Sequence, residues 1–430
     1  MNTTAPRNFT EVFAQFGALW RQEGVVGFTR VVLNLGRHRT WTGTLWQLSL
    51  VTLVGSLGFV FYMLFKEGHA AFNTSSDGVN WGSAISTYVF FALTSSGLSF
   101  IAAMPMVFGF RQFYPIAKRC VWLAIITLIA GFSVLALDLG HPFRMLWAMP
   151  TGFQVQSPMF WMGVFYSIDL VLLFVEFYLL WQNDWTSRLS HLVSTAAFVA
   201  VILASGMLGL VFGSMAMRPM WYGSGTPVFF IVSAALSGAA AIVMSTYLAY
   251  GFNPNNMPGH LREMATGDQL PKVCATFIGI VLVAILTRMW VGMWSNLDGL
   301  EGFHVIARSP LFQFEIWVCL ALPFVMMILP AMQRKPKWQV TAAALVLLGM
   351  FIERYLFLIS GQNVPMFKGT WMEAVTPYSP SITEWMLVIV GHAILFSLYA
   401  LGERLFDLSA EPADAAHASD QLAIREGLAR

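Results

Sequence analysis

Charged residues are scarce in this chain. Of its 430 residues, 11% are Asp, Glu, Lys or Arg, whereas 57% are hydrophobic. Soluble domains carry roughly 25% charged residues, so this composition excludes an ordinary soluble globular protein. The formal net charge of +2 is also too small to indicate a nucleic-acid partner. We therefore expect a protein that lies in a lipid bilayer.

Cysteine is scarce as well. Cys120, Cys274 and Cys319 lie in apolar segments, and none has the paired spacing of a zinc or iron–sulfur site. The chain has no Cys-x-x-Cys-His motif for attached haem. His191 and His392 fall at different depths of their predicted spans, which argues against a shared b-type haem. We expect no bound haem, iron–sulfur cluster or metal, and interpret the cysteines as packing residues.

Ten long apolar runs dominate the rest of the sequence. Each is near the roughly 20 residues needed to cross the hydrocarbon core of a bilayer. Sixteen tryptophans and 36 phenylalanines suit the aromatic belts of a membrane protein. The predicted fold class is an all-α polytopic membrane protein with about ten transmembrane helices. The predicted spans are 43–65, 84–108, 120–139, 160–181, 192–217, 228–252, 273–294, 314–332, 340–360 and 382–403.

A weak internal repeat divides these spans. The pair Ser157-Pro158 opens the fourth span, and a second Ser-Pro pair at 309–310 opens the eighth. Parallel repeats of this kind occur in membrane proteins, so we predict two related four-helix bundles plus flanking helices. Ala321 stands where the first copy has Asp169, so the first bundle is predicted to keep the acidic site. The predicted domains are an amphipathic cytoplasmic N-terminal segment 1–42, a first helix and outer loop 43–83, bundles 84–217 and 218–360, an outer loop and last helix 361–406, and a cytoplasmic tail 407–430.

Positive charges are distributed unevenly between the two sets of connections. The N-terminal segment and alternate connections on its side hold fourteen Lys and Arg residues, and the other side holds five. Because cytoplasmic loops carry the excess of positive charge, we expect both termini in the cytoplasm. No cleavable signal sequence is evident near the start. The predicted location is the cytoplasmic (inner) membrane of a bacterium, with the loop 140–159 facing outside.

Ionisable residues gather between the third and fourth spans. Asp138, His141 and Arg144 follow one another at the end of the third span. Tyr166 and Asp169 lie inside the fourth. Ionisable groups at membrane depth are costly and usually face a cavity or pathway. The plainer interpretation of Asp138 and Arg144 is an ordinary helix end. We predict that all five residues form one site.

A second acid extends this site along the fourth span. Tyr166, Asp169 and Glu176 share one helix face by their spacing. At about 1.5 Å per residue, Asp169 lies roughly 13 Å and Glu176 roughly 24 Å from an outer start near residue 160. Asp169 and Glu176 are therefore a plausible path for protons. The alternative is that Glu176 extends to the inner interface.

A second polar cluster is predicted in the C-terminal half. Its members are Arg288, Glu353, Arg354 and Glu384. The plainer interpretation is an Arg288–Glu353 ion pair that locks two helices together. The functional alternative is a second polar cavity or a rim for docking a partner.

Several motifs in this order resemble the NrfD/PsrC family, also called polysulfide reductase NrfD-like. The sequence Asp-Leu-Gly-His-Pro-Phe-Arg at 138–144 resembles the family's aspartate–leucine–glycine–(arginine or histidine)–proline pattern. The Ser-Pro entry and acidic helix after it fit too. Further matches are Phe-Tyr-Pro-Ile-Ala-Lys-Arg at 113–119, Arg-Pro-Met-Trp-Tyr-Gly at 218–223 and Tyr-Ser-Pro-Ser-Ile-Thr-Glu-Trp at 378–385. The resemblance covers about residues 43–405 and is to the long, ten-span members.

The resemblance implies a membrane subunit without a bound redox cofactor in a respiratory complex. Such a subunit exchanges electrons between a peripheral iron–sulfur subunit and membrane quinone, menaquinone or ubiquinone, with proton uptake or release. A further catalytic or cytochrome subunit would complete the complex. His141 and Asp169 match positions associated with quinone binding and proton exchange. Asp138, Arg144 and Tyr166 would line the same pocket.

The chemistry of these residues fits such a role. Histidine and tyrosine can donate hydrogen bonds to quinone carbonyls, and a buried carboxyl can relay protons. His141 stands where many members of the family have arginine. The outer loops 140–159, 295–313 and 361–382 carry Trp147, Phe303 and Trp371, which suit an interface with the iron–sulfur partner. Two other functions stay open: a secondary transporter with a mid-membrane acidic site, and a non-catalytic membrane anchor.

Overall fold

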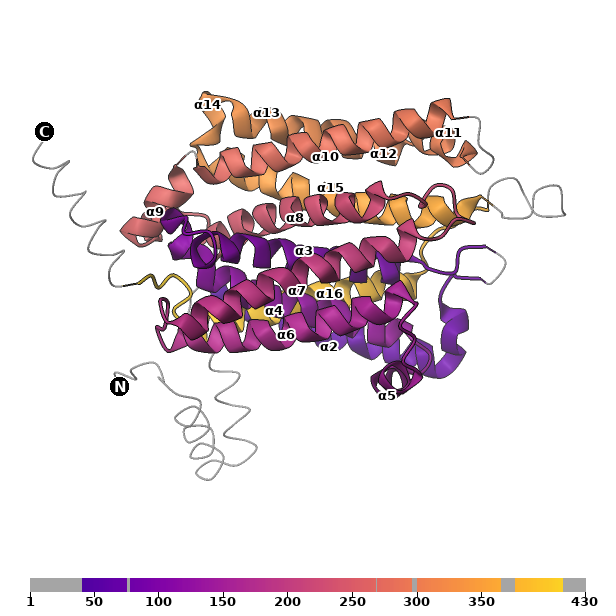
Figure 1. Cartoon of the computed structure of the whole chain (residues 1–430), viewed down its shortest axis with the longest axis horizontal. Coiled ribbons are helices and arrows are strands. Elements are labelled where there is room, and N and C mark those ends of the chain that lie inside the picture. Colours follow the sequence, from indigo (N-terminus) through magenta and orange to yellow (C-terminus); the bar gives the residue numbers. More distant parts are fainter. Residues whose placement is uncertain (1–40, 76–77, 268, 296–299, 365–375, 413–430) are drawn as a thin grey trace, which may run out of the picture.

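The computed structural model describes residues 41–75, 78–267, 269–295, 300–364 and 376–412. Within these ranges the chain forms helices and no strand. Ten of the helical segments in these ranges are long and apolar enough to cross a membrane. They lie side by side with their axes roughly parallel (Figure 1). The predicted all-α, ten-span fold is therefore confirmed, while the N-terminal segment 1–42 and the tail 407–430 lie almost entirely outside the described residues.

Most spans are single helices, and one is composite. The single helices are α2 (Trp41–Glu67), α3 (Ser83–Met106), α4 (Tyr114–Asp138), α6 (Pro158–Trp181), α7 (Arg188–Gly213), α8 (Gly225–Ala249), α10 (Gln269–Trp294), α15 (Pro336–Asn363) and α16 (Ile382–Leu405). The composite span consists of α12 (Pro310–Phe314), the π-helical segment η4 (Glu315–Ala321) and α13 (Leu322–Ile328). The connections contain α5 (Pro142–Gly152), α9 (Gly259–Thr266), α11 (Glu301–Arg308), α14 (Pro330–Gln333) and the short turns η1 (Gly68–Ala71), η2 (Arg111–Phe113) and η3 (Pro254–Asn256).

The bundle has two distinct ends. One carries α5 and α11, and the other carries α9 and α14 (Figure 1). We call them the α5 end and the α9 end. Trp41, where the described chain begins, packs against Phe252 at the α9 end, with 6.2 Å between ring centroids. Near the other terminus, His260 of α9 lies 3.0 Å from the backbone oxygen of Ser409. Both ends of the described chain therefore lie at the α9 end, and which end faces the cytoplasm stays a prediction.

The helix contacts group the spans around α3. This helix packs against α4 and α7, and α6 closes the first four-helix group. The second group contains α8, α10, the composite span and α15. The remaining helices, α2 and α16, pack on each other, and α16 also packs against α4. The domain boundaries and the evolutionary relation of the two groups stay predictions.

Two glycines bring the groups together at the crossing of α3 and α8. A Cβ on Gly97 would lie 1.8 Å from the backbone oxygen of Ala234. A Cβ on Gly238 would lie 2.1 Å from the backbone carbon of Gly97. Small residues allow helix backbones to approach closely in a membrane protein. Glycine is therefore required at both positions for this packing.

The start of α4 differs from the sequence prediction. We expected the third span to begin near residue 120, with Lys118 and Arg119 in a loop. The helix begins instead at Tyr114, and Arg119 is buried. Its Nε and Nη2 donate to the carboxylate of Glu403 in α16 at 2.6 and 3.0 Å. A buried cation needs such a partner, so the bidentate ion pair explains why the helix can include Arg119.

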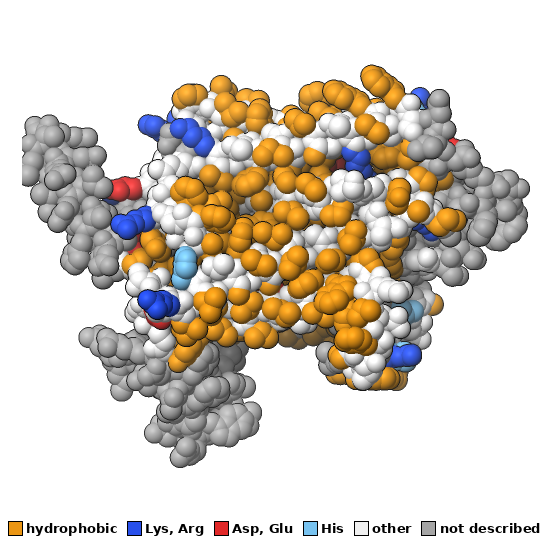
Figure 2. Space-filling view, in the orientation of Figure 1, with side chains coloured by type: hydrophobic (Ala, Val, Ile, Leu, Met, Phe, Trp, Pro, Cys, Tyr) orange, Lys and Arg blue, Asp and Glu red, His pale blue; other side chains and the backbone are white. Residues whose placement is uncertain are grey.

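The surface pattern fits a bilayer. Hydrophobic side chains cover the middle of the face shown in Figure 2, whereas Lys and Arg lie mainly toward its two ends. Exposed apolar side chains include Phe65 on α2, Trp294 on α10 and Trp317 on the composite span. Within α3, the hydroxyls of Thr87 and Thr94 donate to backbone oxygens one turn earlier. Such bonds satisfy hydroxyl groups inside an apolar interior.

Candidate functional site

A pocket of about 570 Å³ opens at the α5 end. It is formed where the chain leaves α4, passes through Gly140 and His141, and starts α5 at a proline, which favours the first turn of a helix. His141 and Arg144 are exposed in this pocket. Phe143 and Trp147 supply aromatic walls. Pockets for small organic molecules have volumes of roughly 300–1,000 Å³, so this one is large enough for such a ligand.

Asp138 lies beside this pocket as the last residue of α4 and is half-buried. His69, from the turn η1 after α2, lies with Nε2 2.7 Å from the backbone oxygen of Asp138, to which this ring nitrogen can donate. The His69 ring also lies near Gly140, where a Cβ would be 3.7 Å from it. His69 was not predicted as a site residue. No local motif indicates it, because the contact joins the turn η1 to the end of α4, which are far apart in the sequence.

Tyr166 and Asp169 lie deeper, on the buried side of α6. Both residues are 0% exposed. The Tyr166 hydroxyl is 3.4 Å from Oγ of Ser96 in α3. Neither carboxylate oxygen of Asp169 has a hydrogen-bond partner in the part of the chain that the structure describes. An unpaired buried polar group is costly, so Asp169 is an unusual feature of this interior.

Glu176 continues the buried face of α6 toward the α9 end. Its carboxylate accepts a hydrogen bond of 2.6 Å from Oγ of Ser194 in α7. Glu176 is 3% exposed, so the alternative that it extends to the interface is wrong. Asp169 and Glu176 are both buried side chains of this helix. The predicted shared helix face is therefore present, while its use as a proton path stays a prediction.

The structure thus divides the five predicted site residues between two places. His141 and Arg144 line the surface pocket, whereas Tyr166 and Asp169 are absent from its lining. Asp138 does not line it either, but ends α4 just before the lining segment begins at Gly140. Helix α5 lies at the end of the bundle (Figure 1), whereas Tyr166 and Asp169 are buried on α6. A ligand in the pocket would contact His141 and Arg144 but neither of these two residues.

The second polar cluster also differs from its prediction. Instead of the expected Arg288–Glu353 ion pair, Glu353 pairs with its neighbour Arg354 at 2.5 Å. Arg288 donates to the backbone oxygen of Met220 at 2.9 Å. Its guanidinium lies 4.5 Å from the ring centroid of Phe357. The aromatic face and the carbonyl together hold Arg288 in place.

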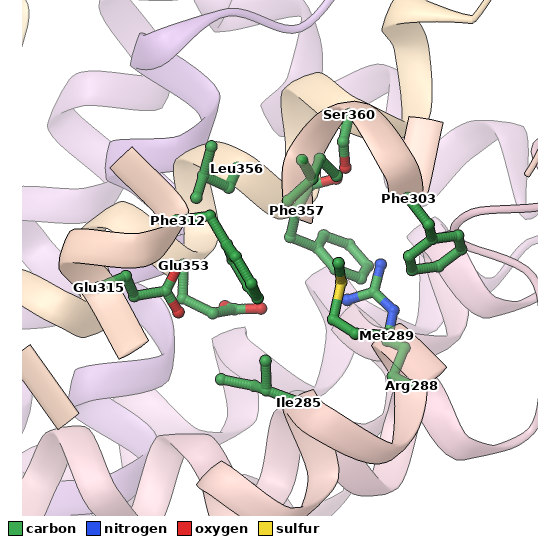
Figure 3. A pocket seen from close by; sticks show the side chains of 11 residues that line it. Ile285, Arg288, Met289, Phe303, Phe312, Glu315, Glu353, Leu356, Phe357 and Ser360 are labelled. Carbon is green, nitrogen blue, oxygen red and sulfur yellow. The ribbon is translucent and has the colours of Figure 1, made fainter. Parts of the chain in front are cut away.

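Arg288 and Glu353 line a small cavity near the α5 end of the second group (Figure 3). Glu315, the first residue of η4, lines the same cavity and is 1% exposed. Glu315 was not among the site residues predicted from the sequence. The signal was an acid within the apolar run Phe-Gln-Phe-Glu-Ile-Trp at 312–317. The second group therefore has buried acids of its own, even though Ala321 stands at the position that matches Asp169.

Glu384 does not line this cavity. It forms a capping box with Ser381 at the start of α16, and it accepts a hydrogen bond of 3.2 Å from the backbone of Asn73. Its carboxylate also bonds the hydroxyl of Tyr378. Burial and the bond to Glu384 raise the pKa of Tyr378, so this hydroxyl stays a donor. Glu384 therefore fastens the connection before α3 to the start of α16.

Among the residues that the structure describes, no group of three His, Cys, Asp or Glu side chains could hold a metal ion.

The fold and the site together define a multi-pass, all-α membrane protein with a surface pocket and buried carboxyl groups. It matches the family model described as polysulphide reductase, NrfD, over residues 72–366. This range covers most of the chain and both four-helix groups, and the chain belongs to this family.

Three curated proteins are similar to the chain over most of their length. A selenate reductase subunit of Mesobacillus selenatarsenatis is 24% identical over 83% of this chain and 92% of that protein. The Hdr-like menaquinol oxidoreductase integral membrane subunit of Archaeoglobus fulgidus is 24% identical over 85% of this chain and 93% of that protein. A putative dimethyl sulfoxide reductase membrane subunit of Halobacterium salinarum is 23% identical over 89% of this chain and 94% of that protein.

Proposed function

We propose that this chain is the membrane subunit of a respiratory redox complex and that it exchanges electrons between an iron–sulfur partner and membrane quinone. The family and the names of three relatives, each a subunit of a reductase or oxidoreductase, support this class of function. The observation that carries the proposal is the pocket at the α5 end. It combines hydrogen-bond donors with aromatic walls.

The pocket suits a quinone head group. The imidazole of His141 and the guanidinium of Arg144 can each donate a hydrogen bond to a quinone carbonyl. Phe143 and Trp147 present apolar surface to the ring and the start of the isoprenoid tail. The remainder of the tail can stay in the lipid that surrounds the bundle. The quinone is an exchangeable substrate in this proposal.

Reduction of a quinone to a quinol takes up two electrons and two protons, and oxidation of the quinol releases them. In the proposed complex, the electrons pass to or from the iron–sulfur partner. Asp169 and Glu176 would carry protons along α6, with Tyr166 between the pocket side and Asp169. General acids and bases of this type act by holding a transferable proton near the reacting group.

The partner is proposed to dock at the α5 end. Helix α5 projects from the bundle there (Figure 1), and Phe143 and Trp147 are 79% and 60% exposed. Exposed aromatic side chains of this kind are frequent anchors of interfaces. Phe303 of α11 is buried against its own chain, so it is no longer a candidate anchor. Trp371 lies outside the described residues.

The test uses the complex purified through a tag on this chain. Added quinol should reduce the iron–sulfur centres of the partner, as followed by electron paramagnetic resonance, and His141→Ala should raise the quinol concentration needed. The matched control is His304→Ala, an exposed histidine at the same end that does not line the pocket. A non-catalytic anchor or a transporter would give no reduction by quinol in any variant. If both variants change the required quinol concentration equally, the pocket is not the quinone site.

A further inference from the structure

The cavity around Glu315 is small but large enough for water. Its volume is about 30 Å³, and a single water needs roughly 10–15 Å³ on this measure, so about two waters fit. The cavity lies between α10, α11, the composite span and α15 (Figure 3). Polar groups of Arg288, Glu315, Glu353 and Ser360 line it beside apolar side chains. Water in such a cavity has the polar partners that it requires.

Glu315 lines this cavity without a full set of partners. The residue is 1% exposed, and its Oε1 has no hydrogen-bond partner among the residues described. In Figure 3 the carboxyl groups of Glu315 and Glu353 lie next to each other on the side of the cavity opposite Arg288. Leaving a buried oxygen unpaired costs stability. A water in the cavity would supply the missing partner.

The backbone at Glu315 is also unusual. The residue begins the π-helical segment η4 within the composite span. π-Helical turns are rare and often occur at functional sites. Such a turn changes the direction of side chains relative to a regular helix, and here Glu315 shares a cavity with residues of α10 and α15. The irregular backbone therefore coincides with the buried, incompletely bonded acid.

The charges around the cavity favour a proton over any other cation. Arg288 lines it from α10, and Glu353 lines it from α15, where it is paired with Arg354 outside the cavity. The α11 and α12 residues that line the cavity are apolar. With Glu315 protonated, the four side chains carry one net positive charge, and with Glu315 ionised they carry none. The guanidinium of Arg288 in the cavity wall would repel a metal cation, whereas a proton can bind to the carboxylate itself.

We propose that Glu315 and the cavity form a second proton-exchange site of this protein, separate from Asp169. The step is the release of the carboxylic proton of Glu315 to the solvent through the water in the cavity, which leaves a carboxylate on Glu315. Arg288 compensates the carboxylate charge, and the reverse step restores the acid. Proton exchange at Glu315 does not depend on the proposed quinone chemistry. Only a role of this exchange during turnover rests on the proposed function.

The site is linked by polar contacts to the place where the two four-helix groups meet. Glu353, which lines the cavity with Glu315, pairs with Arg354. Arg354 in turn donates through Nη2 to Oγ of Ser233 in α8 at 2.6 Å. Ser233 precedes Ala234, whose backbone oxygen meets Gly97 of α3 at the crossing.

The test is chemical labelling of the purified complex with N,N′-dicyclohexylcarbodiimide, followed by peptide mass spectrometry. This reagent attacks protonated carboxyl groups in apolar surroundings. We expect an adduct on Glu315 whose yield falls as the pH is raised. Glu353 is the internal control, since its ion pair with Arg354 should keep it unlabelled. Glu315→Gln preserves size and hydrogen bonding, and it should abolish this adduct while the complex still assembles.

Absence of a Glu315 adduct at every pH, or a yield that does not change with pH, would overturn the inference. A second measurement is the infrared difference spectrum after a pH change. A carboxylic carbonyl band should shift in heavy water and should disappear in Glu315→Gln. Both measurements are made without quinone. The two proposals can therefore fail independently. A complex that does not react with quinol can still exchange the Glu315 proton, and a complex that reacts with quinol can lack this exchange.

Discussion

Tyr166 of α6 and Arg354 of α15 each contact a serine hydroxyl near the crossing of α3 and α8, although they belong to different four-helix groups. Helices α3 and α8, which carry these two serines, cross where the groups meet. The Tyr166 hydroxyl lies 3.4 Å from Oγ of Ser96 in α3, and Arg354 donates to Oγ of Ser233 in α8. The two groups thus share a polar interior at the place where α3 and α8 cross.

This relation predicts energetic coupling between Tyr166 and Arg354. Tyr166→Phe and Arg354→Gln should each lower quinone turnover, and the double variant should lose less than the sum of the two effects. Residues in contact or in one network commonly show interaction energies of about 0.5–3 kcal/mol. Turnover of the four proteins gives the coupling. The control double variant combines Tyr166→Phe with Arg188→Gln, which changes an exposed arginine at the α9 end. If the effects of the single variants on turnover add up in both double variants, the predicted coupling between Tyr166 and Arg354 is contradicted.

Asp169 is predicted to supply the transferable proton of the first group. Asp169→Asn keeps the shape of the side chain but removes the titratable proton, so assembly should survive. Quinone turnover should fall by roughly 10²-fold, which is the order expected for a general acid–base group. Steady-state assays of the purified complex measure this. Asp184→Asn, the same change near the α9 end, should leave turnover intact, and normal turnover of Asp169→Asn would make Asp169 a structural acid.

The crossing of α3 and α8 should tolerate no side chain at Gly97. Gly97→Ala places a Cβ against the backbone of Ala234, and overpacking of this kind costs typically about 1–3 kcal/mol or more. We expect a lower melting temperature of the detergent-solubilised chain. Gly58→Ala on α2 is the control, because nothing lies within 4 Å of its added Cβ. Equal stability of the two variants would show that the helices cross further apart than the structure places them.

Membrane orientation is testable with reporter fusions. The cation asymmetry predicts a cytoplasmic α9 end, where both ends of the described chain lie. Alkaline phosphatase fused after the C-terminus should therefore be inactive, while a fusion that ends after Gly152 of α5 should be active. The opposite pattern of activity would invert the orientation and move the proposed docking face to the cytoplasm.

The membrane architecture could be predicted from the sequence because a bilayer imposes a simple rule. Every span needs a long apolar run, and the ten predicted runs correspond to the ten candidate spans of the structure. The spacing of Asp169 and Glu176 also predicted their shared face correctly, since one helix fixes both positions. Predictions that depend on a single helix therefore succeeded.

Predictions that depend on contacts between distant segments were less successful. The partner of Glu353 is its neighbour Arg354, while Arg288 packs against Phe357. The contact of His69 with Asp138 joins the turn η1 to the end of α4. The repeat offset matches Asp169 with Ala321, so it gives no indication of Glu315. Such choices among several polar groups depend on side-chain packing that no short motif encodes.

Quinone is proposed to react in the pocket that His141, Arg144, Phe143 and Trp147 line. The most direct measurement is photolabelling of the purified complex with an azidoquinone, followed by mapping of the labelled peptides. We expect the label on the segment 140–147, competition by natural quinone, and weaker labelling in His141→Ala but not in His304→Ala. Competable labelling confined to other segments, such as those around Arg288 and Glu315, would contradict the proposed function of this pocket.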